Sequence, residues 1–138
     1  MARILAIDFG LKRIGLAVTD PLRIIATPLD YIDNKDLNHY LTEYFKKEEV
    51  DCIVIGEPLK LSGEETSITK KVHELSGKLK SFFPQKKIEL IDERYTSKIA
   101  LQSMILGGTS KKYRREKGNI DKTSAVIILQ SFLEQQEK

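Results

Sequence analysis

The chain has 138 residues, of which 41% are hydrophobic and 31% charged, and its formal net charge is +3 at pH 7. These values are typical of one globular domain with a sizeable core, here expected to span residues 1–138, and they exclude a disordered chain or a chain of two domains. No apolar run is long enough to cross a bilayer and no signal-peptide pattern is visible, so we expect a cytoplasmic protein without a membrane partner.

The first part of the chain predicts three short strands. Two apolar runs, residues 3–7 and 14–19, flank the turn "GLKRIG", and a connection this short favours an antiparallel hairpin. Residues 24–32 predict a third strand, in which Pro28 favours an edge position or a bulge because proline cannot donate a hydrogen bond to a neighbouring strand. We therefore expect three antiparallel strands.

The remainder of the chain alternates helices with short strands. Apolar residues recur at helical spacing in four segments: residues 35–48, 66–83, 96–106 and from about 119 onward. The runs "CIVIG" (52–56) and "KIELI" (87–91) predict strands, and Cys52, the one cysteine, is expected to be a buried core residue rather than half of a disulfide. Because each run follows a helix, right-handed crossovers place it parallel in the same sheet. The prediction is a mixed α/β fold.

Three of the predicted helices carry an apolar stripe that should face the sheet. In residues 35–48 the stripe comprises Leu37, Tyr40, Leu41, Tyr44 and Phe45. In residues 66–83 it comprises Ile68, Val72, Leu75, Leu79 and Phe82. In the last helix it comprises Ala125, Ile128, Leu129, Phe132 and Leu133.

Three acidic residues stand at places that the topology can bring together. Asp8 ends the first strand, Glu93 follows the last strand in "LIDERYTS", and Asp121 opens the final helix, one turn before Ala125. Sites in open α/β sheets form beyond the carboxyl ends of the parallel strands. Each acid alone could be a turn or helix-capping group. Three neighbouring carboxylates would repel one another, however, and a bound Mg²⁺ would remove that conflict.

Such a metal site suits the hydrolysis of phosphodiester bonds, because a divalent cation polarises the phosphoryl oxygen and activates the attacking water. Gly10 would allow the backbone to approach a phosphate. The basic run "KKYRREK" (111–117) is either a solvated loop or a phosphate-binding patch. The candidate substrate-binding residues are Gly10, Lys12, Arg13, Arg94, Lys111, Lys112, Arg114 and Arg115.

Four segments of the chain together resemble the YqgF family, also called the RuvX or pre-16S rRNA nuclease family. They are "AIDFGLKRIGLAVTD", "IVIGEPLKLSGEET", "IDERYTS" and "DKTSAVIILQSFL", and they follow the family order over essentially the whole chain. The resemblance implies a ribonuclease H-like mixed sheet, with three antiparallel strands first, two parallel strands next and helices on both faces. It also implies a cytoplasmic endonuclease, dependent on Mg²⁺ or Mn²⁺, that acts in ribosome biogenesis on the 5′ end of the small-subunit rRNA precursor.

The resemblance also assigns roles to individual residues. The catalytic and metal-binding acids of the family fall on Asp8, Glu93 and Asp121, and the arginine of its "DER" motif, a substrate contact, falls on Arg94. The chain departs from the family at Glu57, because an apolar residue more often follows the glycine of the middle strand. Related resolvases place a catalytic acid near the end of that strand, so Glu57 is either a fourth ligand or a solvent-facing neighbour of Pro58.

Three other functions remain open at this stage. The same chemistry could cut four-way DNA junctions, for which a symmetric dimer is expected because two strands must be cut. The protein could instead be a non-catalytic RNA-binding assembly factor. "DFGLKRIG" also resembles the phosphate loop of actin-like and sugar kinases, although those enzymes close two domains over ATP and this chain provides one. We expect a nucleic-acid partner and a monomer or homodimer.

Overall fold

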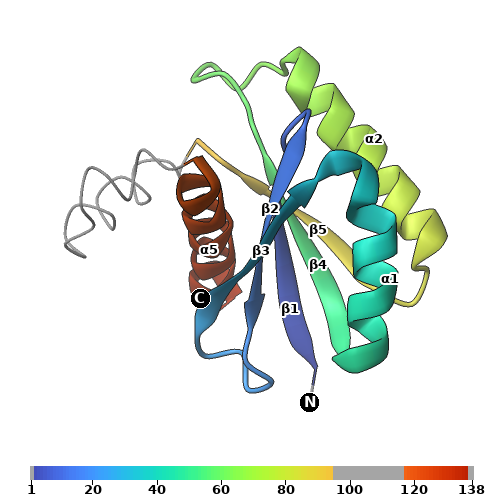
Figure 1. The fold of residues 1–138 in the computed structure, drawn as a ribbon. Helices are drawn as coiled ribbons and strands as arrows, with labels where there is room; N and C mark the ends of the chain where they lie inside the picture. The colour runs from blue at the N-terminus through green and yellow to red at the C-terminus, as the bar shows by residue number, and fades with distance from the viewer. Residues whose placement is uncertain (1, 95–116, 137–138) are drawn as a thin grey trace.

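The computed structural model of the protein describes residues 2–94 and 117–136, with side chains as far as Arg94 and again from Ser124. A five-stranded sheet forms its centre, in the order β3-β2-β1-β4-β5. Helices α1 and α2 cover one face of this sheet and α5 covers the other (Figure 1). The strands and helices, with one short 3-10 helix η1, are β1 (Arg3–Asp8), β2 (Arg13–Thr19), β3 (Ala26–Asp33), η1 (Asn34–Asp36), α1 (Leu37–Lys47), β4 (Val50–Glu57), α2 (Ser67–Phe82), β5 (Lys87–Asp92) and α5 (Lys117–Gln136).

The strand directions confirm the mixed sheet that the sequence predicts. β1 pairs antiparallel with β2, and β2 antiparallel with β3, whereas β1 with β4 and β4 with β5 are parallel pairs. Pro28 lies in the edge strand β3 beside a shift of register, opposite Ala17, where a missing N–H donor is tolerated. Three antiparallel strands are thus followed by two parallel ones, with helices on both faces.

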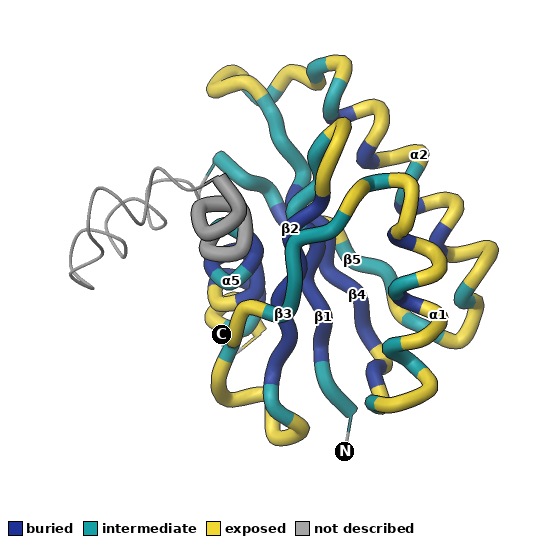
Figure 2. Tube along the Cα trace, in the orientation of Figure 1, coloured by how far each residue is buried: buried dark blue, intermediate teal, exposed yellow. Residues whose placement is uncertain are grey.

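Alternating side chains of the strands feed two separate cores, one on each face of the sheet. The core under α1 and α2 contains Leu5, Ile7, Ile53 and Ile55, among other buried residues. The core under α5 contains Ile4, Ala6, Cys52 and Val54, which alternate with these residues along β1 and β4, and also Ile91 of β5. Figure 2 shows the buried residues concentrated in the central strands. Whether a residue stands at an odd or an even position along its strand therefore decides which face of the sheet its side chain lies on.

The apolar stripes of α1 and α5 pack as predicted. In α5, four of the five predicted residues are buried, and Leu133 packs against them from the edge of the core. Cys52 is buried as expected, and burial raises the pKa of its thiol to about 11. In the described part of the chain, no helix is long and apolar enough to span a membrane.

Two details of the predicted helices need correction, and one predicted helix lies outside the described residues. Phe82 is 60% exposed, and Phe83, the next residue, packs on the core instead. The reason is that α2 ends at Phe82, so the chain turns and directs the ring of Phe83 edge-on against Phe45, with 5.1 Å between ring centroids. The last helix begins at Lys117, two residues before the predicted start, and the helix predicted over residues 96–106 lies outside the described residues.

The contrast between the two phenylalanines can be tested by truncation. Phe83→Ala should lower the free energy of unfolding by about 2–3 kcal/mol, because it removes partly buried aromatic contacts. Phe82→Ala, the matched control, should change it by less than about 1 kcal/mol because that ring is mostly in solvent. Urea denaturation of both variants measures the difference. Equal losses would contradict the packing described here.

Candidate active site

The carboxyl ends of β1, β4 and β5 meet at one edge of the sheet. In the parallel register Ile7 lies opposite Ile55, and Ile55 lies opposite Leu90. Residues that follow these positions therefore emerge side by side, at the same end of the molecule as the start of α5 (Figure 1). This edge is where a site is expected in a parallel α/β arrangement.

Asp8 and Glu93 share the face of the sheet that α5 covers. Asp8 stands two residues after Ala6, and Glu93 two residues after Ile91, and both of these apolar residues belong to the core under α5. The Asp8 carboxyl is close enough to influence the pKa of Glu93 as a hydrogen-bonding group, so the two carboxyl groups are neighbours. The structure thus brings together two of the three predicted acids.

The environment of Glu93 favours its neutral form. Burial raises the pKa of this carboxyl above its ordinary value of 4.5, the hydrogen bond with Asp8 lowers it, and the negative charge of Asp92 raises it again. Burial is the largest of these effects, so the pKa is raised overall. Glu93 therefore holds its proton more tightly than a carboxyl group in water does.

Gly56 supplies the space in which the Glu93 carboxylate lies. A Cβ built on Gly56 would touch Glu93 Oε1, and it would lie 2.7 Å from Ile128 Cδ1 and 2.9 Å from Glu93 Cδ. On the other side of β1, Asp8 is paired with Gly15, which also has no side chain. Small residues on both neighbouring strands thus leave a recess around the acid pair.

Position 121 lies near the start of α5, at the end of the molecule where the strands terminate. α5 packs against β1, β2, β3 and β4, and Ala125 is fully buried in the core under it. Position 121 lies one turn before Ala125, toward the end of the helix where the strands terminate. The side chain of Asp121 lies outside the described part of the structure, so its place in the site stays a prediction.

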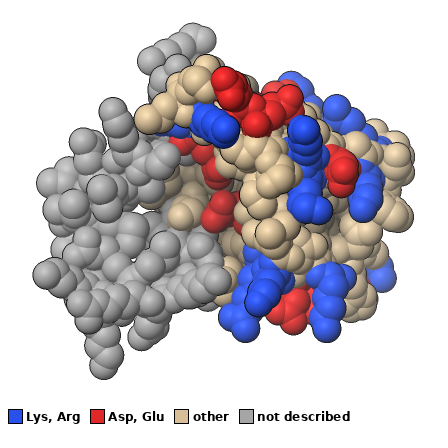
Figure 3. Space-filling model, turned by 90° about the horizontal axis from the view of Figure 1, so that it is seen from above, with Lys and Arg blue, Asp and Glu red and all other residues tan. Residues whose placement is uncertain are grey.

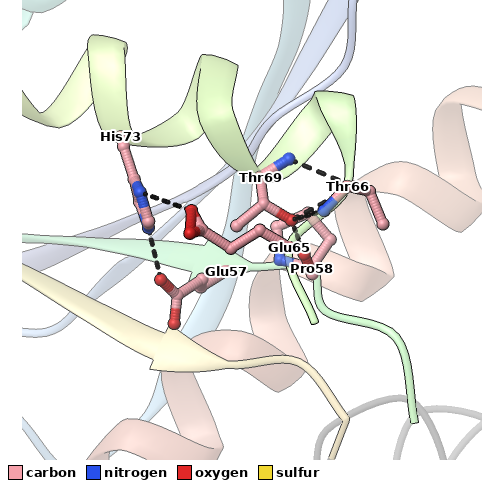
Figure 4. A network of polar contacts seen from close by, with 6 residues as sticks. All are labelled: Glu57, Pro58, Glu65, Thr66, Thr69 and His73. Atoms are coloured by element: carbon pink, nitrogen blue, oxygen red, sulfur yellow. Dashed lines mark hydrogen bonds and ion pairs between the residues drawn. The ribbon is translucent and has the colours of Figure 1, made fainter. Parts of the chain in front are cut away.

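Glu57 belongs to the opposite face of the sheet. It follows Ile53 and Ile55, which lie in the core under α1 and α2. Its Oε2 is 2.5 Å from His73 Nε2, and the other ring nitrogen of His73 is 3.1 Å from Glu65 Oε1 (Figure 4). The alternation of side chains along β4 therefore separates Glu57 from the acid pair, and its contact with His73 of α2 holds it there.

Arg94 is anchored within the protein. Its Nε and Nη2 donate to Asp92 Oδ2 at 2.9 and 2.6 Å, and its Nη1 donates to the carbonyl oxygen of Leu61 at 3.3 Å. The hydrogen bond from Arg94 holds the pKa of Asp92 below its ordinary value. Arg94 thus ties the end of β5 to the loop over residues 58–66, and its predicted contact with substrate stays a prediction.

A cavity of about 510 Å³ opens beside Asp8 at the turn between β1 and β2, and its lining includes Gly10, Lys12 and Arg13. Gly10 is required there, because a Cβ would collide with the carbonyl group of Arg13. Asn34 fixes the turn through two hydrogen bonds. Its Nδ2 donates to the carbonyl oxygen of Gly10 at 2.7 Å, and its backbone N–H donates to the carbonyl oxygen of Lys12 at 2.8 Å.

Arg13 is itself held above the cavity. Its Nε lies 3.6 Å from Asp33 Oδ1, and its guanidinium lies 5.7 Å from the ring centroid of Tyr31. Seen from above, acidic side chains lie in a recess of the surface, and Lys and Arg side chains lie on the coloured part of the surface near it (Figure 3). The four remaining predicted substrate contacts lie outside the described residues: Lys111, Lys112, Arg114 and Arg115.

The donors of the site are carboxylate oxygens, which suit a hard divalent cation. In the described part of the chain, no group of three or more His, Cys, Asp and Glu side chains could hold a metal ion. Asp8 and Glu93 nevertheless offer carboxylate oxygens, the donors that Mg²⁺ and Mn²⁺ prefer, and a cation would relieve the repulsion within the pair. The observed pair fits such an ion, and Asp121 is the predicted third donor.

Sequence reasoning missed two residues that shape the site. Gly56 was visible only as the last residue of an apolar strand, and nothing local shows that a carboxylate from the next strand lies over it. Asn34 belongs to no sequence motif, although it directly follows β3 and therefore lies beside the β1–β2 turn. Both act through contacts between segments far apart in the sequence.

Comparisons with known proteins show which proteins this chain is similar to. A family model described as "RuvX: Holliday junction resolvase" matches residues 2–135. A protein of Amoebophilus asiaticus named "Putative pre-16S rRNA nuclease" is 50% identical over 133 residues, which make up 96% of this chain and 94% of the relative. A protein of the same name from Christiangramia forsetii is 47% identical over 136 residues, covering 96% of this chain and 98% of the relative.

Solved structures show the same fold at much lower identity. T. thermophilus RuvC in complex with a Holliday junction substrate has a TM-score of 0.61 and 13% identity, and the match covers 99% of this chain and 96% of that one. The Fowlpox virus resolvase, also with Holliday junction DNA, has a TM-score of 0.59 and 14% identity, with 99% of both chains covered. The architecture is therefore the ribonuclease H-like sheet of these resolvases.

The close approach of Gly56 to the acid pair gives a prediction of stability. Gly56→Ala should lower the free energy of unfolding by about 1–3 kcal/mol, because the added methyl group overpacks the space of Glu93. Gly77→Ala is the matched control, since a Cβ on this α2 glycine meets no atom within 4 Å. That change should raise stability by about 0.5–1 kcal/mol through helix propensity. Urea denaturation distinguishes the opposite signs.

The raised pKa of Glu93 gives a prediction of pH dependence. The folded protein binds this proton more tightly than the unfolded chain, so the contribution of Glu93 to stability falls as pH rises from its ordinary pKa through the raised value. Glu93→Gln should therefore be more stable than the wild type at neutral pH in EDTA, and the difference should shrink in acid. A variant that is less stable than the wild type at neutral pH would contradict this.

Proposed function

The chain belongs to the RuvX family, and from this premise we propose that it is a metal-dependent endonuclease that processes the precursor of the small-subunit rRNA. The proposal rests on the carboxyl pair of Asp8 and Glu93, which lies beside a cavity lined by basic residues at the carboxyl edge of the sheet. Two relatives named "Putative pre-16S rRNA nuclease" are 50% and 47% identical to this chain, and the matches cover 94% and 98% of their lengths.

In this proposal Asp8, Glu93 and Asp121 hold the metal, Mg²⁺ or Mn²⁺, through oxygen ligands. The bound cation would supply Lewis-acid activation of the phosphoryl group and of the attacking water. Asp8 and Glu93 are positioned for this role because neighbouring glycines leave room for their carboxyl groups. Burial under α5 lowers the local dielectric and strengthens their interaction with a cation.

The basic residues around the cavity bind the substrate backbone. Lys12 and Arg13 lie in the lining of the cavity, and Asn34 keeps their turn in place. Arg94 contributes a cation at the opposite side of the strand ends, while its bonds to Asp92 fix its position. We propose that the residues of the basic run continue this surface: Lys111, Lys112, Arg114 and Arg115.

We propose the 5′ end of the 16S rRNA precursor as the site of cleavage and the cytoplasm as the place of action. The support is the name of the relatives, together with the family resemblance of the four sequence segments. Fully processed and precursor-extended RNA ends, offered in the same reaction, test this specificity directly.

The catalytic assignment is tested by neutral replacements of the two acids. Asp8→Asn and Glu93→Gln should each reduce cleavage of precursor RNA by at least about 100-fold, because each removes a metal-binding charge. Glu49→Gln, which removes an exposed acid outside the site, is the control and should cleave normally. Retained cleavage in Asp8→Asn would overturn the catalytic assignment, and unimpaired ribosome assembly in cells carrying Asp8→Asn would favour a non-catalytic assembly factor.

A second candidate substrate is the four-way DNA junction. The matching family model is described as a Holliday junction resolvase, and solved structures of the same fold contain junction DNA. Incubation of the protein and Mn²⁺ with synthetic junctions and with precursor RNA distinguishes the two substrates. Cleavage of junctions alone, by a dimer that cuts both strands, would establish the resolvase in place of the RNA nuclease.

A further inference from the structure

A second hollow lies across the β1–β2 turn from the cavity at Asp8. Its volume is about 230 Å³, and its lining comprises Phe9, Leu11, Asn34, Lys71, Glu74, Leu75 and Lys78. Phe9 and Leu11 line both hollows, so the two lie next to each other at the turn. We call this second hollow the α2 groove. It opens on the face of the sheet that α1 and α2 cover, away from the acid pair.

The α2 groove presents positive charge along one side of a helix. Lys71 and Lys78 are exposed and seven residues apart, so they share a face of α2 and lie roughly 10 Å apart along its axis. Among the described residues, neither lysine makes an ion pair. Glu74 lies between them and is the one acid in the lining of the groove. The lysines therefore keep charge available for an anionic partner.

The groove is also joined rigidly to the candidate active site. Asn34 lies in its lining and donates to the Gly10 carbonyl oxygen, so the groove and the turn bearing Lys12 and Arg13 are fixed to each other. Leu11 is 59% exposed at the crest between the two hollows and offers an apolar surface to a sugar or base. A chain that crosses this crest would meet cations on both sides of it.

We infer that the α2 groove binds the phosphodiester backbone of the substrate strand on one side of the bond to be cut. The inference rests on the proposed nuclease function and extends its binding surface to Lys71 and Lys78. The spacing of the lysines allows them to contact two different phosphates of a single strand, since the rise per nucleotide is only about 3.4 Å. The contact is independent of sequence because the groove offers charge rather than a hydrogen-bonding pattern for bases.

The test is a binding titration with a cleavage-inactive parent, Asp8→Asn. The probes are two fluorescent RNA hairpins, one blunt and one with single-stranded extensions at both ends, and the anisotropy is followed over a range of salt concentrations. Adding Lys71→Ala and Lys78→Ala should weaken binding of the extended probe about tenfold. The slope of log K against log salt concentration should become smaller by about 1.4, because each lost phosphate contact contributes roughly 0.7. Binding of the blunt probe should change less, because no strand reaches the groove.

Matched variants separate charge at the groove from total charge. Lys47→Ala with Lys80→Ala removes two exposed lysines that lie outside both hollows, and it should bind both probes as the parent does. Lys71→Arg with Lys78→Arg should retain tight binding, which excludes a folding defect as the cause. Thermal denaturation of each variant checks that the fold is intact.

Three outcomes would overturn the inference in different ways. If the alanine pair and the control pair bind the extended probe equally, the groove does not contact RNA, and the proposed function stands. If the parent binds neither probe, the inference and the proposed function fail together. If the alanine pair leaves RNA binding unchanged but dissolves a dimer in sedimentation experiments, the groove is an interface between two copies of the chain.

Discussion

The close contact between the carboxyl groups of Asp8 and Glu93 is the constraint on which the rest of the site depends. Two acids from strands that are not adjacent meet on the face of the sheet that α5 covers. This arrangement costs folding free energy, because burial favours the neutral form of Glu93. It persists because Gly56 on β4 has no side chain that could fill the space of the Glu93 carboxyl group, and because α5 covers the same face of the sheet. Such local destabilisation is common where a protein binds an ion or substrate.

The alternation of side chains along the strands divides the acids at the sheet edge into two groups with different roles. Glu93 faces α5 and joins Asp8, whereas Asp92, its neighbour in sequence, bonds Arg94, and Glu57 bonds His73. Asp92 and Glu57 thus each contact a basic residue, whereas Asp8 and Glu93 lie close to each other. The carboxyl pair is the place where a bound cation would be useful.

The basic partners also fix the segments around the site. Arg94 joins the end of β5 to the loop over residues 58–66, and His73 joins that loop to α2 through Glu65. On the other side Asn34 joins η1 to the β1–β2 turn. The two segments that flank the strand ends are therefore held by hydrogen bonds from neighbouring elements. A preorganised site of this kind binds a charged substrate with little loss of conformational entropy.

Sequence alone determined the strands, their directions and the acids at their ends, because apolar runs, helical periodicity and crossover handedness are local or nearly local patterns. It could not decide whether Glu57 would join Glu93, since that depends on the face each strand presents after its last paired residue. It also could not show that Gly56 lies beneath Glu93, or that Phe83 rather than Phe82 reaches the core. These features arise from strand register and from the angle at which a helix ends, and only contacts between distant segments fix them.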